Sequence, residues 1–184
     1  MLGGRRQERR EQRREERRGD SGTTHYRMRQ KLFSIGDDYW IEDERGDRVF
    51  KVDGKALRLR KTLILEDAHG GELLKIQERM LRVRDTMEIE DRDGRSVATV
   101  KKAMISPLRE RWSVQVADGP DLDVKGNILD HEYTIEDGRT TVAEVSKRWF
   151  RIADTYGVEV ASGQDPALML AVTAVVDTMA HRGD

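Results

Sequence analysis

The chain has 184 residues, of which 38% are charged and only 36% hydrophobic, so it can form one domain with an economical core. That balance favours strands with one solvated face over a stack of buried helices. The net charge of −1 excludes a bulk electrostatic attraction to nucleic acid, and the lack of cysteine excludes disulfides, thiol catalysis and thiolate metal sites.

The N-terminal segment is strongly biased in composition. Residues 5–18, RRQERREQRREERR, contain eight Arg and four Glu and no apolar residue that could dock onto a core. Arg pairs recur every four residues, which gives Glu the i,i+3 and i,i+4 spacings of helical ion pairs. We expect residues 1–22 to form a disordered tail or a frayed, solvated helix, and the alternative is an arm that grips an acidic surface. The folded domain is expected over residues 23–184.

The expected domain contains a repeated unit of strand, acidic turn with Gly, and second strand. The acidic turns follow Ile41, Leu65 and Ile89 at a constant spacing of 24 residues. A weaker copy covers residues 114–126, and the pattern returns at Ile135. Asp bonds its own backbone nearby and Gly tolerates positive φ, so each unit predicts a β-hairpin.

The last predicted element is a helix over about residues 166–181. Between 166 and 180 the only polar residues are Thr173, Asp177 and Thr178, so the helix is apolar around most of its circumference and must be buried on all sides. Asp165 suits the N-cap and Pro166 the first helical position. Five hairpins with flanking strands give about twelve strands, and a closed barrel of that size has an interior too wide for its own side chains. We therefore predict a mainly β fold, an antiparallel closed barrel of about twelve strands around a buried C-terminal helix.

Two stretches resemble a known family. GKALRLRKTLILEDAHGGELLKI at 54–76 and ADTYGVEVASGQDPALMLAVTAVVD at 153–177 are similar to the LURP-one-related proteins, which belong to the tubby C-terminal-like superfamily together with the phospholipid scramblases. The resemblance covers about residues 26–180. It implies a twelve-stranded barrel around a buried C-terminal helix, and binding of phosphoinositide headgroups through basic residues. The chain lacks the cysteines through which scramblases are palmitoylated, and it lacks their calcium motif.

Charge follows the repeat: acids crowd the tight turns, and bases crowd the opposite strand ends and longer connections. If the hairpins lie side by side, one rim of the barrel is negative and the other positive, and Arg on the positive rim offers bidentate contacts to phosphate. The alternative is that Asp simply favours turns while bases solvate strands; KRWFR at 147–151 is also a candidate foot at a membrane surface. The residues predicted to bind an anion or lipid are Arg58, Arg60, Lys61, Arg82, Arg84, Arg109, Arg111, Lys147, Arg148 and Arg151.

A second candidate site is a polar clasp of Lys61, Asp85 and Asp154. Each of these residues is followed by Thr, and strict alternation turns Lys61 and Asp85 inward, in phase with neighbouring apolar residues. A buried Lys–Asp pair would form a small polar site in the barrel mouth, with Asp177 of the helix nearby. The alternative is a β-bulge that shifts the phase and moves the charges to the rim.

No catalytic signature is present. The four histidines are isolated, H-E-x-x-H is absent, and neither a nucleophile elbow nor a phosphate-binding glycine loop occurs. We therefore expect no catalytic residue, metal or cofactor.

The leading hypothesis is a non-enzymatic binding module that recognises anionic phospholipid headgroups, phosphoinositide-like, or an acidic partner through the basic rim. One alternative is a protein-interaction or scaffolding module that uses the Arg-rich arm. A further alternative is an enzyme with a deep polar pocket containing Lys61, Asp85 or Asp154. We expect a monomeric cytoplasmic protein that acts peripherally at membranes. No transmembrane span is expected, because about 15 helical residues reach only ~22 Å. Nucleic acid is not an expected partner.

Overall fold

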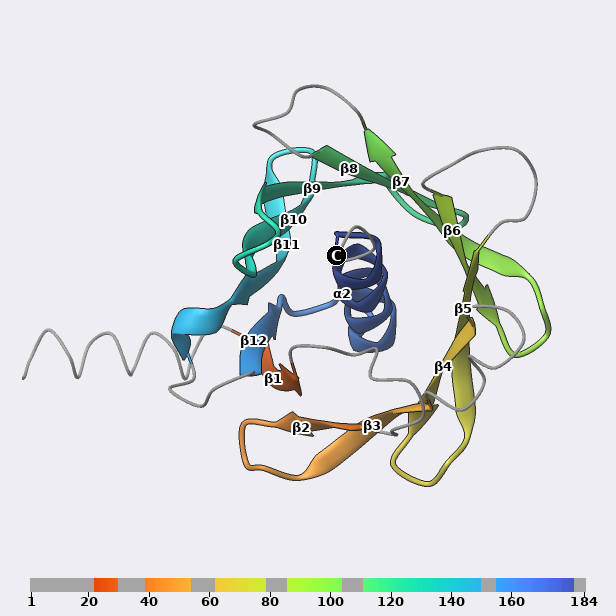
Figure 1. The fold of residues 1–184 in the computed structure, drawn as a ribbon, viewed down its shortest axis with the longest axis vertical. Coiled ribbons are helices and arrows are strands. Elements are labelled where there is room, and N and C mark those ends of the chain that lie inside the picture. The colour runs from red at the N-terminus through yellow and green to blue at the C-terminus, as the bar shows by residue number, and fades with distance from the viewer. Residues whose placement is uncertain are drawn as a thin grey trace, which may run out of the picture.

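The computed structural model describes residues 22–29, 39–53, 62–78, 86–103, 111–149 and 155–180. These residues form twelve antiparallel strands that close into one barrel, and the C-terminal helix α2 (Pro166–Ala180) lies inside the ring of strands (Figure 1). The predicted fold class is therefore confirmed.

The strands follow one another along the chain with a single short 3₁₀ helix, η2, between the last two. They are β1 (Thr24–Arg29), β2 (Tyr39–Asp43), β3 (Arg48–Asp53), β4 (Thr62–Asp67), β5 (Glu72–Glu78), β6 (Thr86–Asp91), β7 (Ser96–Ala103), β8 (Arg111–Val116), β9 (Leu122–Asn127), β10 (Glu132–Asp137), β11 (Thr140–Ser146), η2 (Lys147–Trp149) and β12 (Thr155–Val160).

The barrel is an up-and-down meander that β1 closes. From β2 to β12 each strand pairs with the next, and β1 fills the remaining place between β2 and β12. Its pairing with β12 extends over six residues, whereas its pairing with β2 consists of Tyr26 opposite Asp43 and Arg27 opposite Glu42. Closure leaves no strand of the described sheet with an open edge, and open edges are the usual route to aggregation.

The 24-residue repeat appears in the structure as three matching turns. In each turn an Asp carboxylate accepts hydrogen bonds from the backbone N–H groups two and four residues later, at 2.8–2.9 Å. A Gly three residues after that Asp has φ near +80°, a conformation that costs other residues energy, and a β-bulge precedes the Asp. The Asp–Gly pairs are Asp43 and Gly46, Asp67 and Gly70, and Asp91 and Gly94.

The same repeat produces a ladder of ion pairs on the outer wall. A basic residue lies directly across from a glutamate of the next strand in three places, each displaced by 24 residues along the chain. The pairs are Arg27 with Glu42, Lys51 with Glu66 (3.3 Å) and Lys75 with Glu90 (3.1 Å). Partly exposed pairs of this kind contribute little individually, but they fix opposite charges in register across neighbouring strands.

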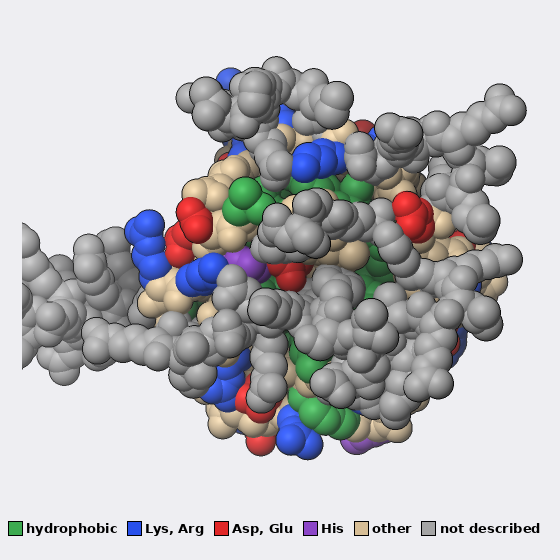
Figure 2. Space-filling view, viewed as in Figure 1, with side chains coloured by type: hydrophobic (Ala, Val, Ile, Leu, Met, Phe, Trp, Pro, Cys, Tyr) green, Lys and Arg blue, Asp and Glu red, His purple; other side chains and the backbone are tan. Residues whose placement is uncertain are grey.

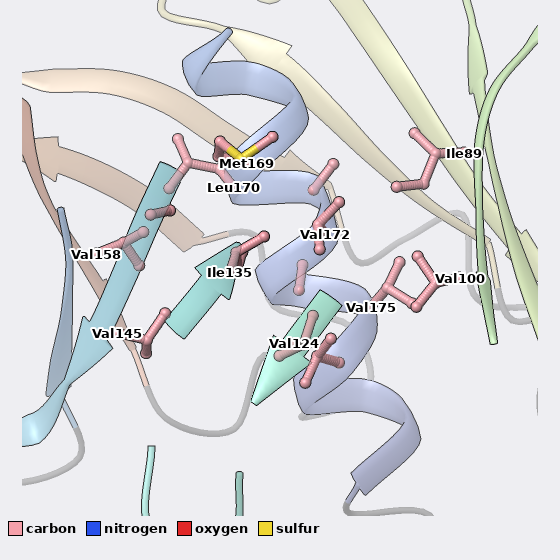
Figure 3. Packing of buried hydrophobic residues seen from close by; sticks show 14 of the residues in the cluster. Ile89, Val100, Val124, Ile135, Val145, Val158, Met169, Leu170, Val172 and Val175 are labelled. Atoms are coloured by element: carbon pink, nitrogen blue, oxygen red, sulfur yellow. The ribbon is translucent and has the colours of Figure 1, made fainter. Parts of the chain in front are cut away.

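The core is the space between the sheet and α2. Alternate residues of the strands point inward and meet the helix: Figure 3 shows Ile89 and Val100 on one side of α2, and Val145 and Val158 on the other. No residue of α2 is exposed, and its middle, Met169–Asp177, is buried throughout. The predicted all-round burial of this helix is therefore confirmed.

The start of α2 is as predicted. The Asp165 carboxylate accepts a hydrogen bond from the backbone N–H of Ala167 at 2.9 Å, and Pro166 is the first helical residue. An N-cap of this kind satisfies an N–H group that has no partner inside the helix. The expected end near residue 181 lies beside the last described residue, Ala180.

Gly126 is expected to tolerate no side chain. Its φ is +138°, and a Cβ would lie 2.5 Å from the Glu132 carbonyl oxygen and 2.6 Å from the Tyr133 Cα. Gly126→Ala should lower the free energy of unfolding by more than about 3 kcal/mol, because the opposing atoms are backbone. Gly70→Ala is the control, because it has a similar strain at φ +83° but no described atom within 4 Å, and it should cost about 1 kcal/mol. Equal losses in urea denaturation would contradict a close backbone approach at Gly126.

Candidate binding site at the loop end of the barrel

The barrel has two distinct ends. All the tight hairpin turns except the one between β9 and β10 lie at one end, which we call the turn end. At the other, which we call the loop end, the even-numbered strands begin and the odd-numbered strands finish. The helix α2 starts after β12 at the turn end and finishes at the loop end (Figure 1). Figure 2 looks onto the loop end, where basic and acidic side chains both occur among the residues drawn in colour.

Three of the predicted anion-binding residues are described, and all three lie at the loop end. Arg111 is the first residue of β8 and is exposed, and Lys147 and Arg148 form the start of η2. The remaining predicted residues lie outside the described part of the chain. These are Arg58, Arg60, Lys61, Arg82, Arg84, Arg109 and Arg151.

Glu132 organises the start of η2. Its carboxylate accepts hydrogen bonds from the Ser146 hydroxyl (3.0 Å) and from the backbone N–H of Lys147 (3.2 Å). The Arg148 Nε lies 3.5 Å from the same carboxylate, although the Arg148 side chain is 83% exposed. Glu132 therefore fixes the backbone at the start of η2 and offsets part of the charge of Arg148.

Arg111 stands on the outer wall, directly across from Lys125 of β9. Lys125 donates to the Glu136 carboxylate at 2.7 Å, and this bond raises the pKa of Lys125 and lowers that of Glu136. Thus Glu136 is already engaged by Lys125, and Arg111 is the more exposed of the two neighbouring cations.

The acids of the turn end have structural roles. Hydrogen bonds from the backbone N–H groups of Gly71 and His69 lower the pKa of Asp67, and the N–H of Arg95 does the same for Asp91. The neighbouring glutamates Glu66 and Glu90 form the ion pairs of the outer ladder. These acids of the turn end therefore stabilise the hairpin turns and the ion pairs of the ladder.

A separate group of carboxylates lies on the outer wall of β11 and β12. Glu144 stands directly across from Glu159, which also bonds the imidazole of His25 at 2.7 Å. Partial burial, together with the charges of Glu159 and Glu132, raises the pKa of Glu144. This flank of the barrel repels anions, so the loop-end cations are bordered by acids on this side.

The predicted polar clasp of Lys61, Asp85 and Asp154 lies outside the described residues. The Thr residues that follow its members, Thr62, Thr86 and Thr155, are all buried at the loop end. The described residues do contain a buried polar contact at this end. Asp177 of α2, which was expected near the clasp, accepts a hydrogen bond from the Nε2 of His131 at 2.6 Å.

The His131–Asp177 pair is almost completely enclosed. The two side chains are 1% and 3% exposed, and they join residues 46 positions apart in the chain. His131 has φ +51°, and it is the only non-Gly residue with positive φ among those described. Strained backbone of this kind persists where the surroundings hold it in place, here through the bond to the helix. Sequence analysis treated His131 as isolated, and the single signal for the pair was the acidic residue inside an apolar helix.

Three tyrosines lie near this pair, each the first or second residue of its strand. Tyr39 of β2, Tyr133 of β10 and Tyr156 of β12 are fully buried, and the imidazole of His131 packs against the Tyr156 ring at 4.4 Å. Burial, with a smaller contribution from Asp177, raises the pKa of all three phenols well above its ordinary value. The hydroxyls of Tyr39 and Tyr156 form no hydrogen bond with any of the described residues.

This inner cluster is suited to hydrogen bonding. Its phenols stay protonated and can donate, and Asp177 and His131 orient one another. Among the described residues no group of three His, Asp or Glu side chains could hold a metal ion. The described part of the loop end thus combines an enclosed polar interior with exposed cations outside it.

The comparison with known proteins agrees with the fold and the motifs. The sequence model of the LURP-one-related family matches residues 24–177. The chain belongs to this family. The chain is also similar to the uncharacterized protein YxjI of Bacillus subtilis (strain 168), which is 27% identical over 157 residues, covering 85% of this chain and 94% of YxjI.

A solved structure shares the fold of this LURP-one-related domain. The X-ray structure of a protein from Arabidopsis thaliana superposes with a TM-score of 0.64 at 19% identity, covering 86% of this chain and 91% of that protein. At this identity the likeness concerns the fold alone. Over the described residues of the LURP-one-related barrel, no helix is both long and apolar enough to cross a bilayer.

Asp177 is expected to be required for the stability of the LURP-one-related barrel. Asp177→Ala removes the acceptor of a buried hydrogen bond and leaves His131 enclosed, so it should lower the free energy of unfolding by about 3 kcal/mol. Asp177→Asn keeps an oxygen acceptor and should cost less. Thr178→Ala is the matched control, because its half-buried hydroxyl only donates to the Ala174 carbonyl of its own helix. A loss for Asp177→Ala no larger than that of the control would show that the pair is dispensable.

Two carboxylates should give the stability opposite pH dependences. The folded pKa of Asp67 is lowered, so its contribution is present at neutral pH and is lost as the pH falls through that folded pKa; Asp67→Asn should therefore destabilise at pH 7 and have less effect in acid. The folded pKa of Glu144 is raised, so its ionisation opposes folding, and Glu144→Gln should stabilise at pH 7 and be neutral in acid. Thermal melts of both variants across pH 3–7 test this, and equal signs at pH 7 would contradict it.

Proposed function

We propose that this LURP-one-related domain is a non-enzymatic binding module whose loop end recognises the anionic headgroups of phospholipids. The observation that carries the proposal is the excess of basic over acidic residues in the connections of the loop end, together with the cations that the structure describes there. Arg111 and Arg148 are exposed at the loop end, and Lys147 is half-buried there. At the turn end, Asp67, Asp91 and Glu90 are bonded within turns and ion pairs.

The composition of the connections at the loop end supports a role for the remaining predicted anion-binding residues. The segments 30–38, 54–61, 79–85, 104–110 and 150–154 all join strand ends at the loop end, and 181–184 follows α2 there. Together they contain eleven Lys or Arg and six Asp or Glu. Cations gathered at one end of a rigid scaffold are the arrangement that attracts a phosphate-rich surface. Arg58, Arg60, Arg82 and Arg84 contribute most of this excess.

The first test removes these four charges. Replacing Arg58, Arg60, Arg82 and Arg84 with Gln should weaken co-sedimentation with phosphoinositide-containing vesicles about a hundredfold, because each basic residue near such a surface contributes about 1 kcal/mol or somewhat less. The steepness of the salt dependence should fall as well, since fewer ionic contacts remain to be screened.

The control removes the same charge from the other end. Arg45, Arg92, Arg95 and Arg139 are all exposed in the tight turns, and replacing them with Gln changes the net charge equally. Binding should then stay within a few-fold of the parent protein. If both variants lost vesicle binding equally, net charge alone would explain the loss, and the loop end would be rejected as the binding face.

Truncation separates this proposal from an interaction through the Arg-rich segment. A protein that lacks residues 1–22 should bind the vesicles as the full chain does, because the loop end is intact. Loss of vesicle binding on truncation, with retention in the loop-end variant, would assign the binding to the N-terminal segment instead.

A further inference from the structure

The turn between β9 and β10 presents an apolar residue to solvent. Leu129 is 55% exposed and is the only large hydrophobic side chain among the described residues that is exposed. The His131 N–H donates to the Ile128 carbonyl at 3.0 Å, so residues 128–131 form a β-turn with Leu129 and Asp130 at its tip. This turn lies at the loop end, next to the exposed cations.

The turn is held firmly on both sides of Leu129. Ile128 is 3% exposed and belongs to the core cluster, and His131 is anchored to Asp177 inside the barrel. Asn127 donates to the Asp130 carboxylate at 2.5 Å and accepts from the Asp130 N–H at 3.2 Å. A single exposed Leu is common on protein surfaces, but here the flanking residues point one side chain outward from a fixed turn.

The helix η2 begins beside this turn. Glu132 directly follows the turn, and its carboxylate binds the backbone of Lys147 and the side chain of Arg148. Trp149 of the same helix lies half-buried against His25, with ring centroids 5.8 Å apart, so it packs on the flank of the barrel. Phe150, the other aromatic residue of the predicted KRWFR foot, lies outside the described residues. Among the described residues, the exposed apolar tip of this edge is therefore Leu129.

We propose that Leu129 inserts into the acyl boundary of an anionic bilayer while Arg111, Lys147 and Arg148 bind the headgroups. This inference rests on the proposed function and adds the orientation of the domain on the membrane. Asp130, the other residue at the tip, is bonded to Asn127, and Glu132 brings the basic residues of η2 close to the turn. An apolar side chain on such a turn matches a surface that is anionic outside and apolar a few ångströms below. Burial of one Leu side chain should strengthen binding about tenfold.

A single label tests the insertion directly. The chain contains no cysteine, so Leu129→Cys creates a unique attachment point for an environment-sensitive fluorophore. With vesicles of phosphatidylcholine and phosphatidylserine the emission should shift to the blue and be quenched by nitroxide-labelled acyl chains, and pure phosphatidylcholine should give neither effect. Ala68, exposed in the β4–β5 turn at the opposite end, provides the control as Ala68→Cys, which should stay unchanged.

Two substitutions measure the contribution to binding. Leu129→Ser should weaken vesicle binding about tenfold and leave its salt dependence intact, because the cations remain. Adding Ala68→Leu restores the apolar composition at the wrong end and should not restore binding. Unchanged binding of Leu129→Ser, or equal fluorescence shifts at positions 68 and 129, would overturn the insertion while leaving headgroup recognition standing. Absence of vesicle binding by the parent protein would overturn both.

Discussion

The structure depends on one requirement, the complete enclosure of an apolar helix. With only 36% hydrophobic residues the chain cannot support several buried layers. Its buried apolar side chains lie mainly on one helix and on the inner face of one closed sheet. Each strand supplies inward residues to the same core, and the outer face remains polar. β1 closes the barrel, which removes the open edges of the sheet and completes the wall of strands around α2.

Enclosure of α2 also buries one charged residue, Asp177, near the loop end. Asp177 would be a costly residue inside an apolar barrel, and the Nε2 of His131 reaches it from the β9–β10 turn. The same bond holds His131 at positive φ and so sets the shape of that turn. The turn that this contact anchors presents Leu129 at its tip, and Glu132, the residue after the turn, bonds the backbone at the start of η2.

The repeat explains why most of the fold was predictable. Asp67 and Gly70 specify a turn through local hydrogen bonding and backbone freedom, and the same chemistry recurs 24 residues away, so hairpin number and position follow from local sequence. The helix start was equally local, in Asp165 and Pro166. The site was harder to predict from the sequence, because His131 and Asp177 lie 46 residues apart in the chain and meet only when the barrel is closed in its observed register. The buried tyrosines at the starts of strands, Tyr39 at the first and Tyr156 at the second position, gave no periodic signal either. The turn that presents Leu129 was not predicted from the sequence either.

Native-state hydrogen exchange of α2 tests the enclosure most directly. A helix surrounded by a continuous wall can open only when the wall opens, so the amides of Met169–Asp177 should exchange with the same free energy as those of β10 and β12, that of global unfolding. Exchange of the helix at a markedly lower free energy, with the strands still protected, would mean that α2 leaves an intact barrel and would contradict its role as the enclosed centre of the fold.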